Sequence, residues 1–152
     1  IHKNPVLADR FYGFCRAMME AGILVTQNHI LVDRDENGHY ALSASQLSHI
    51  PTAFICSRDS SAYQLLKILK EKNIRVPEDV SITGFDDYIL SSLCTPKITT
   101  YSIDVAKLTD SCIWLLLDRI AQPDRPLRHI VISGKIMERD SVRTLSTNPE
   151  SR

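Results

Sequence analysis

The sequence predicts an α/β domain with a parallel sheet and helices on both of its faces. Helical and strand-like patterns alternate along the 152 residues, and such alternation produces parallel sheets whose crossover helices cover both faces. Residues 52–56 are a short apolar run of the kind found in buried parallel strands, and apolar positions alternate through residues 80–83 as in a strand. A hydrophobic content of 43% supports a packed core.

The first predicted element is a helix over residues 5–21. Asn4 has the form of an N-cap, Pro5 stands in the first helical turn, and apolar residues then recur at helical spacing. Residues 23–32 are apolar enough to predict a short strand. A charged turn follows, and residues 39–47 predict a weak helix.

The middle of the chain predicts the centre of the sheet. Residues 52–56 form the first buried strand, and Asp59 is a candidate N-cap for a helix that ends near Asn73. A turn then leads into the strand at residues 80–83. Residues 88–93 predict a short helical connection, which is followed by an extended segment.

The last third predicts one long helix and two short strands. The helix runs from Asp104 to about Ala121, because apolar residues recur there at helical spacing and prolines follow. Residues 128–132 and 135–138 are strand candidates on either side of a glycine. The tail from Thr144 is polar, and we expect it to fray.

Composition limits the classes of partner. Lys and Arg together number 18, as do Asp and Glu, so the net charge is zero and neither nucleic acid nor an anionic membrane is attracted by the chain as a whole. No apolar run reaches the roughly 18 residues that cross a bilayer. The histidines have no metal-ligand spacing, so we expect neither a metal nor a cofactor.

The four cysteines are widely separated and form no CxxC pair. Three of them lie in apolar patterns that predict buried thiols. Free core thiols favour a reducing cytoplasm. The cysteines are Cys15, Cys56, Cys94 and Cys112.

The stretch at residues 80–87 is the first place to look for a function. Gly84, Phe85, Asp86 and Asp87 follow the apolar strand, and acidic groups at the carboxyl end of a buried strand lie where open α/β sheets bind ligands. An enzyme with Asp86 and Asp87 as an acid–base pair is an alternative. Adjacent strand residues point to opposite faces, and no nucleophile or glycine-loop motif accompanies them, so we expect no catalytic residue.

Several short motifs follow one another in a fixed order. They are Pro51-Thr52-Ala53, Asp59 with its helix, Val76-Pro77-Glu78-Asp79-Val80-Ser81, Gly84-Phe85-Asp86-Asp87, Thr95-Pro96, Thr99-Thr100 and Glu138-Arg139-Asp140-Ser141-Val142. In this order the chain resembles the carboxyl-terminal part of the LacI/GalR family of bacterial transcription regulators. The resemblance implies an effector-binding domain of the type I periplasmic-binding-protein class, in which two α/β lobes close on a small molecule. It also implies a homodimer and a separate amino-terminal DNA-binding headpiece.

The resemblance further implies that the chain is mostly the C-terminal lobe of a longer protein. We expect residues 1–101 to form that lobe without its first strand, 102–127 to be a helix of the missing N-terminal lobe, 128–143 to return to the C-terminal lobe, and 144–152 to be a flexible tail. A helix without its lobe would expose an apolar patch with Leu108, Cys112 and Leu115. We therefore expect the isolated chain to be unstable, aggregated or paired.

The resemblance assigns ligand binding chiefly to Arg10 and Asp86, since family members commonly hold the effector between an arginine of the first helix and the first aspartate of the GFDD-type motif. A guanidinium and a carboxylate can together grip sugar hydroxyls. A solvated helix arginine and a strand-end cap are the alternatives. Phe85 either lines the pocket or fills the core beneath it.

Two positions depart from the family pattern. Arg58 stands where relatives usually have an asparagine, and Asp33 is the nearest match to an aromatic residue that stacks on the effector. Arg58 either pairs with Asp86 or Asp59 or contacts the ligand. In the second case Arg10 and Arg58 would together bind an anionic effector such as a sugar phosphate.

The helix after Asp59 and the connection after Asp87 are elements that family members use for dimer contacts, and a buried core is the alternative, above all for Leu66. The implied interface residues are Tyr63, Leu66, Ile89, Leu90 and Leu93. We expect Asp87 to be structural, as a cap for the segment that follows it.

The sequence thus predicts the effector-sensing and dimerisation part of a cytoplasmic transcription regulator. Its expected partners are a sugar or sugar phosphate and a second copy, with DNA contacted only through an absent domain and with no membrane. The alternative is a periplasmic sugar-binding protein that serves a transporter. Free thiols and the segments at residues 76–81 and 138–142 argue against that alternative.

Overall fold

The computed structural model describes residues 4–144. Its centre is a four-stranded sheet in the order β1-β2-β3-β4, formed by β1 (Ala53–Ile55), β2 (Ser81–Asp86), β3 (Thr99–Ser102) and β4 (Lys135–Met137). The first three strands are parallel, as predicted, whereas β4 pairs antiparallel with β3. The sheet is therefore mixed, because the last strand returns against the direction of β3.

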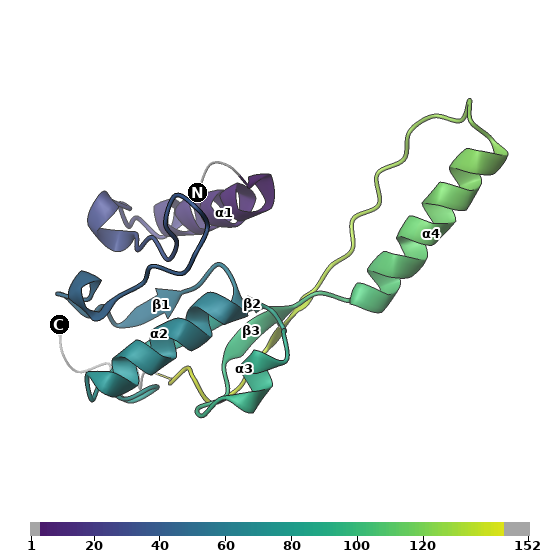
Figure 1. Cartoon of the computed structure of the whole chain (residues 1–152). Coiled ribbons are helices and arrows are strands. Elements are labelled where there is room, and N and C mark those ends of the chain that lie inside the picture. Colours follow the sequence, from purple (N-terminus) through teal and green to yellow (C-terminus); the bar gives the residue numbers. More distant parts are fainter. Residues whose placement is uncertain (1–3, 145–152) are drawn as a thin grey trace.

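The buried core lies between the sheet and α2 (Asp59–Glu71), with the one-turn helix α3 (Leu90–Leu93) beside it (Figure 1). Apolar residues of α2 recur on one face and meet the inward side chains of β2. The buried apolar residues are Leu47, Ala62, Leu65, Leu66, Leu69, Val76, Val80, Ile82 and Ile98.

Helix α1 (Pro5–Glu20) begins as the sequence predicts. The Asn4 side-chain oxygen accepts hydrogen bonds from the backbone N–H groups of Val6 and Leu7, at 3.0 and 3.4 Å. No residue of α1 is fully buried. The helix lies outside the core and contributes to the site chiefly through Arg10.

Helix α4 (Val105–Ala121) confirms the long predicted helix, and the Asp104 side chain caps it by accepting from the N–H of Lys107 at 2.9 Å. The helix projects away from the sheet, and the chain returns beside it in an extended form (Figure 1). No residue of α4 is buried. Of the predicted patch, Leu108 and Cys112 are exposed and Leu115 is half-buried. The assignment of α4 to another lobe stays a prediction, as do the four segment boundaries; 145–152 lie outside the described residues.

Three predicted elements are wrong. Residues 23–32 contain a 3₁₀ turn, Gln27–His29, instead of a strand. Residues 39–47 contain the 3₁₀ turn Ala44–Gln46 instead of a helix, and Tyr40 forms an isolated antiparallel bridge with Arg34. Residues 128–132 form no strand either. A strand requires a neighbour for its backbone hydrogen bonds, and the apolar runs at 23–32 and 128–132 pair with no strand in the described part of the chain.

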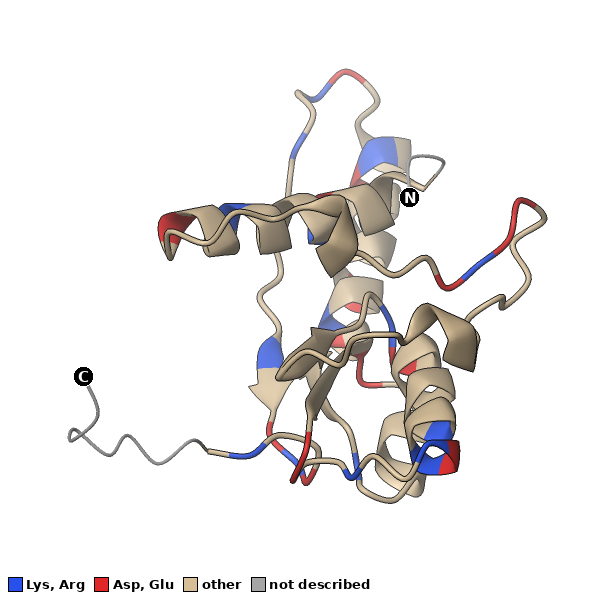
Figure 2. Cartoon of the chain, turned by 90° about the vertical axis from the view of Figure 1, so that its left-hand side faces the viewer, with Lys and Arg blue, Asp and Glu red and all other residues tan. Residues whose placement is uncertain are grey.

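Positively and negatively charged residues both occur in several elements of the described chain (Figure 2), and they are equal in number over the whole sequence. No helix in residues 4–144 has the length and apolarity to cross a membrane. The thiols differ from the prediction, since Cys15, Cys56 and Cys94 are only partly buried and Cys112 is exposed on α4.

Candidate functional site

The site begins where β2 ends. Asp86 and Asp87 have positive φ values of 102° and 54°, which residues other than glycine rarely adopt. The backbone therefore turns sharply at the carboxyl end of β2. The two carboxylates leave the strand in different directions, toward Arg10 and Arg139 respectively.

Arg10 of α1 reaches this strand end. Its Nη2 donates to Oδ1 of Asp86 at 2.7 Å, and its Nη1 donates to the carbonyl oxygen of Ser57 at 2.6 Å. The guanidinium carbon also lies 3.8 Å from the centre of the Phe85 ring, a cation–π contact. The side chains of Arg10 and Asp86 are 17% and 36% exposed, so both remain open to solvent.

Phe85 continues the site toward β3. Its ring centre lies 4.9 Å from that of Tyr101, and the Tyr101 hydroxyl accepts a hydrogen bond from the N–H of Gly134 at 2.8 Å. Tyr101 is not among the residues that the sequence predicts for the site. Its position directly after the Thr99-Thr100 motif is the one signal that points to it.

Asp33 and Arg58 lie near the N-terminus of α2. The Asp33 carboxylate accepts a hydrogen bond from the hydroxyl of Ser61. Arg58 is the N-cap residue of α2. It forms no ion pair within residues 4–144, so of its two alternatives the pairing with Asp86 or Asp59 is wrong, and the ligand contact stays a prediction.

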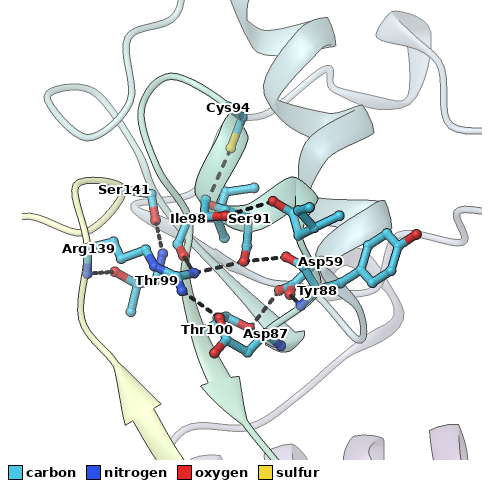
Figure 3. Close-up of polar contacts among 12 residues, drawn as sticks. Asp59, Asp87, Tyr88, Ser91, Cys94, Ile98, Thr99, Thr100, Arg139 and Ser141 are labelled. Atoms are coloured by element: carbon cyan, nitrogen blue, oxygen red, sulfur yellow. Dashed lines mark hydrogen bonds and ion pairs between the residues drawn. The ribbon is translucent and has the colours of Figure 1, made fainter.

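Asp59 does not cap its own helix, and that prediction is corrected. Its side chain is buried, and it accepts from the Tyr88 N–H and from the Thr100 hydroxyl, each at 2.6 Å (Figure 3). Burial raises the pKa of the Asp59 carboxyl, and the charges of Asp86 and Asp87 add to that rise, although the two hydrogen bonds oppose it.

Asp87 is structural, but not as the predicted cap. Its carboxylate pairs with the Arg139 guanidinium, which also donates to the Ser91 hydroxyl and the Ile98 carbonyl oxygen (Figure 3). Burial alone would raise the pKa of Asp87, but the hydrogen bonds from Arg139 and Ser102 outweigh it, so the pKa lies below its usual value. Asp59, not Asp87, accepts from the segment that follows.

The five residues predicted for dimer contacts have different surroundings. Leu66 is 7% exposed and belongs to the core, which favours its core interpretation. Ile89 and Leu93 are 59% and 70% exposed. Leu90 is partly buried. The centre of the Tyr63 ring lies 4.5 Å from the Lys67 ammonium nitrogen. The interface role of these residues stays a prediction.

The described residues contain no group of three His, Cys, Asp or Glu side chains placed to hold a metal ion. The site instead combines a guanidinium, a carboxylate and an aromatic ring. This set can donate to, accept from and stack against a polar ring. It suits recognition of a small hydroxylated molecule.

The chain is similar to known proteins over almost its whole length. The family model of the periplasmic binding protein-like domain matches residues 2–142. The chain is 33% identical over 141 residues to the HTH-type transcriptional repressor PurR of Vibrio atlanticus, a match that covers 91% of the chain and 42% of that protein. It is 38% identical over 129 residues to the arabinose metabolism transcriptional repressor of Halalkalibacterium halodurans, covering 74% and 34% respectively.

Solved structures share the fold. A LacI family transcriptional regulator from Enterococcus faecium with bound ribose matches at a TM-score of 0.77 and 26% identity, over 92% of this chain and 53% of that one. The Escherichia coli transcriptional repressor ascG matches at a TM-score of 0.77 and 24% identity, over 95% and 53%. The chain spans about two-fifths of the length of the curated PurR relatives.

Proposed function

We propose that this chain is the effector-sensing and dimerisation part of a bacterial transcription regulator. The chain belongs to the periplasmic binding protein-like domain family, and its homologues are LacI-family repressors. It binds a small sugar-like molecule, and occupancy modulates DNA binding by a headpiece outside this sequence. It acts in the cytoplasm and catalyses no reaction. The curated relatives are repressors, which favours this function over a transporter's binding protein.

One observation carries the proposal, namely the meeting of Arg10 and Asp86 beside the Phe85 ring. The guanidinium has five N–H donors, of which only some are used by Asp86 and Ser57, and the carboxylate has further acceptor positions. Vicinal hydroxyls of a sugar can accept from the one and donate to the other. The aromatic face beside them can pack against the apolar face of the sugar ring.

Arg58 extends the proposal to the charge of the effector. It stands next to Ser57, whose carbonyl oxygen anchors Arg10, and it has no acidic partner within residues 4–144. Two guanidinium groups that act on one ligand favour a phosphate over a neutral hydroxyl. We therefore propose a sugar phosphate as the effector, with a neutral pentose as the alternative that Asp33 and Asp86 would favour.

The test uses the full product of the gene. Thermal shift is measured with D-ribose and L-arabinose and with their 5-phosphates, and a sugar that binds the folded protein should raise its melting temperature. Asp86→Ala should abolish the shift, whereas Asp79→Ala, which removes an exposed carboxylate paired with Arg75, should preserve it. An unchanged shift in Asp86→Ala would remove Asp86 from the site.

The same titration tests the effector class. If a sugar phosphate binds, Arg58→Gln should reduce its affinity about tenfold while the affinity for the neutral sugar is little changed. Arg75→Gln is the matched control, because Arg75 is exposed and pairs with Asp79 away from the site. A wild-type preference for neutral sugars would contradict the anionic effector and leave the sensing function in place.

Dimerisation is assigned to the exposed apolar residues of the α2–α3 side. Ile89 and Leu93 are exposed there without being part of the core, and exposed apolar groups of this kind mark interfaces. Replacing both by Asp should convert the dimer of the full gene product to monomers in sedimentation velocity. A dimer that survives both changes would place the interface elsewhere.

A further inference from the structure

The turn that carries Asp86 has a backbone that needs external support. Asp86 and Asp87 both have positive φ values, and two successive residues with side chains rarely adopt that conformation. Such a turn persists only where its surroundings hold it. The supporting contacts therefore decide where the Asp86 carboxylate lies.

Asp59 supplies these contacts to two successive amides. The N–H of Tyr88 donates directly to Oδ2 of Asp59 at 2.6 Å. The N–H of Asp87 donates to the Thr100 hydroxyl oxygen at 3.4 Å, and that hydroxyl donates to Oδ1 of Asp59 at 2.6 Å. Figure 3 shows Asp59 beside Tyr88 and close to Thr100. Both carboxylate oxygens are thus engaged.

The fit between Asp59 and β2 is close. A Cβ atom added to Gly84 would lie 2.0 Å from Oδ1 of Asp59, well inside any allowed contact. Gly84 precedes Asp86 by two residues, so the buried carboxylate lies directly against the strand that carries the site. Asp59 is only 1% exposed and cannot move out into solvent without opening this contact.

Asp59 differs from the neighbouring carboxylates of Asp86 and Asp87 because it pairs with no cation among the described residues. Arg10 pairs with Asp86 and Arg139 pairs with Asp87, whereas Asp59 forms no ion pair within the described residues. Its two hydrogen-bond donors come from the turn and from β3. Because a buried carboxylate is costly unless it is hydrogen-bonded, Asp59 keeps these donors in place.

We infer that Asp59 is a positioning residue of the effector site, whose carboxylate holds the backbone of residues 86–88 so that the Asp86 carboxylate faces Arg10. The inference rests on the proposed function only in taking Asp86 as the group that contacts the effector. Arg139 holds the same turn from the other side, through the Asp87 carboxylate.

Residue-resolved amide hydrogen exchange tests the inference without any effector. In the full gene product, Asp59→Asn replaces a charged acceptor by a neutral one and should speed exchange at the Asp87 and Tyr88 amides about fivefold. The Ile82 amide, which donates to the Ser141 carbonyl oxygen, should keep its rate. Asp79→Asn is the matched control, because Asp79 lies in an exposed turn with Arg75.

A second variant reaches the same contact from β2. Gly84→Ala should displace Asp59 and speed exchange at the same two amides, whereas Gly13→Ala, which meets no atom within 4 Å, should not. Unchanged exchange at Asp87 and Tyr88 in both variants would overturn the inference, and so would an equal rise at Ile82, which marks general loss of stability. Since no sugar is present, these outcomes are independent of the Asp86→Ala binding experiment.

Discussion

Ser141 and Ile82 lie 59 residues apart in the sequence and exchange two hydrogen bonds in the structure. The Ser141 hydroxyl donates to the Ile82 carbonyl oxygen at 2.6 Å, and the Ile82 N–H donates to the Ser141 carbonyl oxygen at 2.8 Å. The same hydroxyl oxygen accepts from the Thr99 N–H at 2.8 Å. Ser141 is fully buried, so it joins β2 and β3 where β4 has ended.

Removing this hydroxyl should therefore cost stability. Ser141→Ala removes the acceptor of the buried Thr99 N–H and one donor to the buried Ile82 carbonyl oxygen. We therefore expect the free energy of unfolding in urea to fall by about 2 kcal/mol. Ser92→Ala is the control, since its exposed hydroxyl bonds only to the Ile89 carbonyl oxygen. Equal losses in the two variants would contradict the assigned role.

The Arg139–Asp87 pair predicts a pH dependence of stability. The pKa of Asp87 is lowered in the folded state, so its contribution is present above the unfolded pKa of 3.8 and is lost as the pH falls through the lower folded value. Asp87→Asn should lower the melting temperature by about 3 °C near neutral pH. The difference from wild type should shrink in acid below about pH 4. A difference that grows on acidification would refute the pairing.

The cysteines predict a pattern of chemical reactivity. Burial raises the pKa of the Cys56 thiol to about 12, with further contributions from the charges of Asp33 and Asp59. Because the thiolate is the reactive form, Cys56 should resist iodoacetamide in the native chain near pH 8 and react after unfolding in urea. Exposed Cys112 should react without urea. Peptide mass spectrometry measures both, and native labelling of Cys56 at the Cys112 rate would contradict the prediction.

The uncovered face of α4 predicts self-association of the 152-residue chain. Leu116 and Ile120 are 60% and 67% exposed on this helix, and exposed apolar surface of this extent favours association. Changing both to Lys should reduce association in sedimentation velocity without lowering the melting temperature. Leu24→Lys, at a position 79% exposed off the helix, should have little effect. A monodisperse wild-type chain with cooperative melting would argue against the prediction.

The elements that the sequence predicts correctly are those with a strong local pattern. Asn4 and Asp104 both cap the helices expected after them, since a cap depends only on the next few residues. The strand predicted at 128–132 fails, because an apolar run does not reveal whether a neighbouring strand exists. The turn to an antiparallel β4 also depends on where α4 directs the chain, which no local pattern specifies.

The site is less predictable for the same reason. Asp59 has the local form of an N-cap, yet its partners Tyr88 and Thr100 stand 29 and 41 residues further along. Arg10 and Asp86, separated by 76 residues, are linked in the sequence only by family resemblance. Their ligand role stays a prediction, whereas their contact is a feature of the fold.

The two passages of chain between the sheet and α4 lie side by side and touch. A Cβ atom on Gly134 would lie 2.3 Å from the carbonyl oxygen of Ser102 and 2.5 Å from the Tyr101 ring. The outgoing and returning segments therefore leave the sheet as one closely packed pair. Tyr101 belongs to this pair and its ring also packs against Phe85, so the connection between the sheet and α4 lies within one aromatic contact of the Arg10–Asp86 pair.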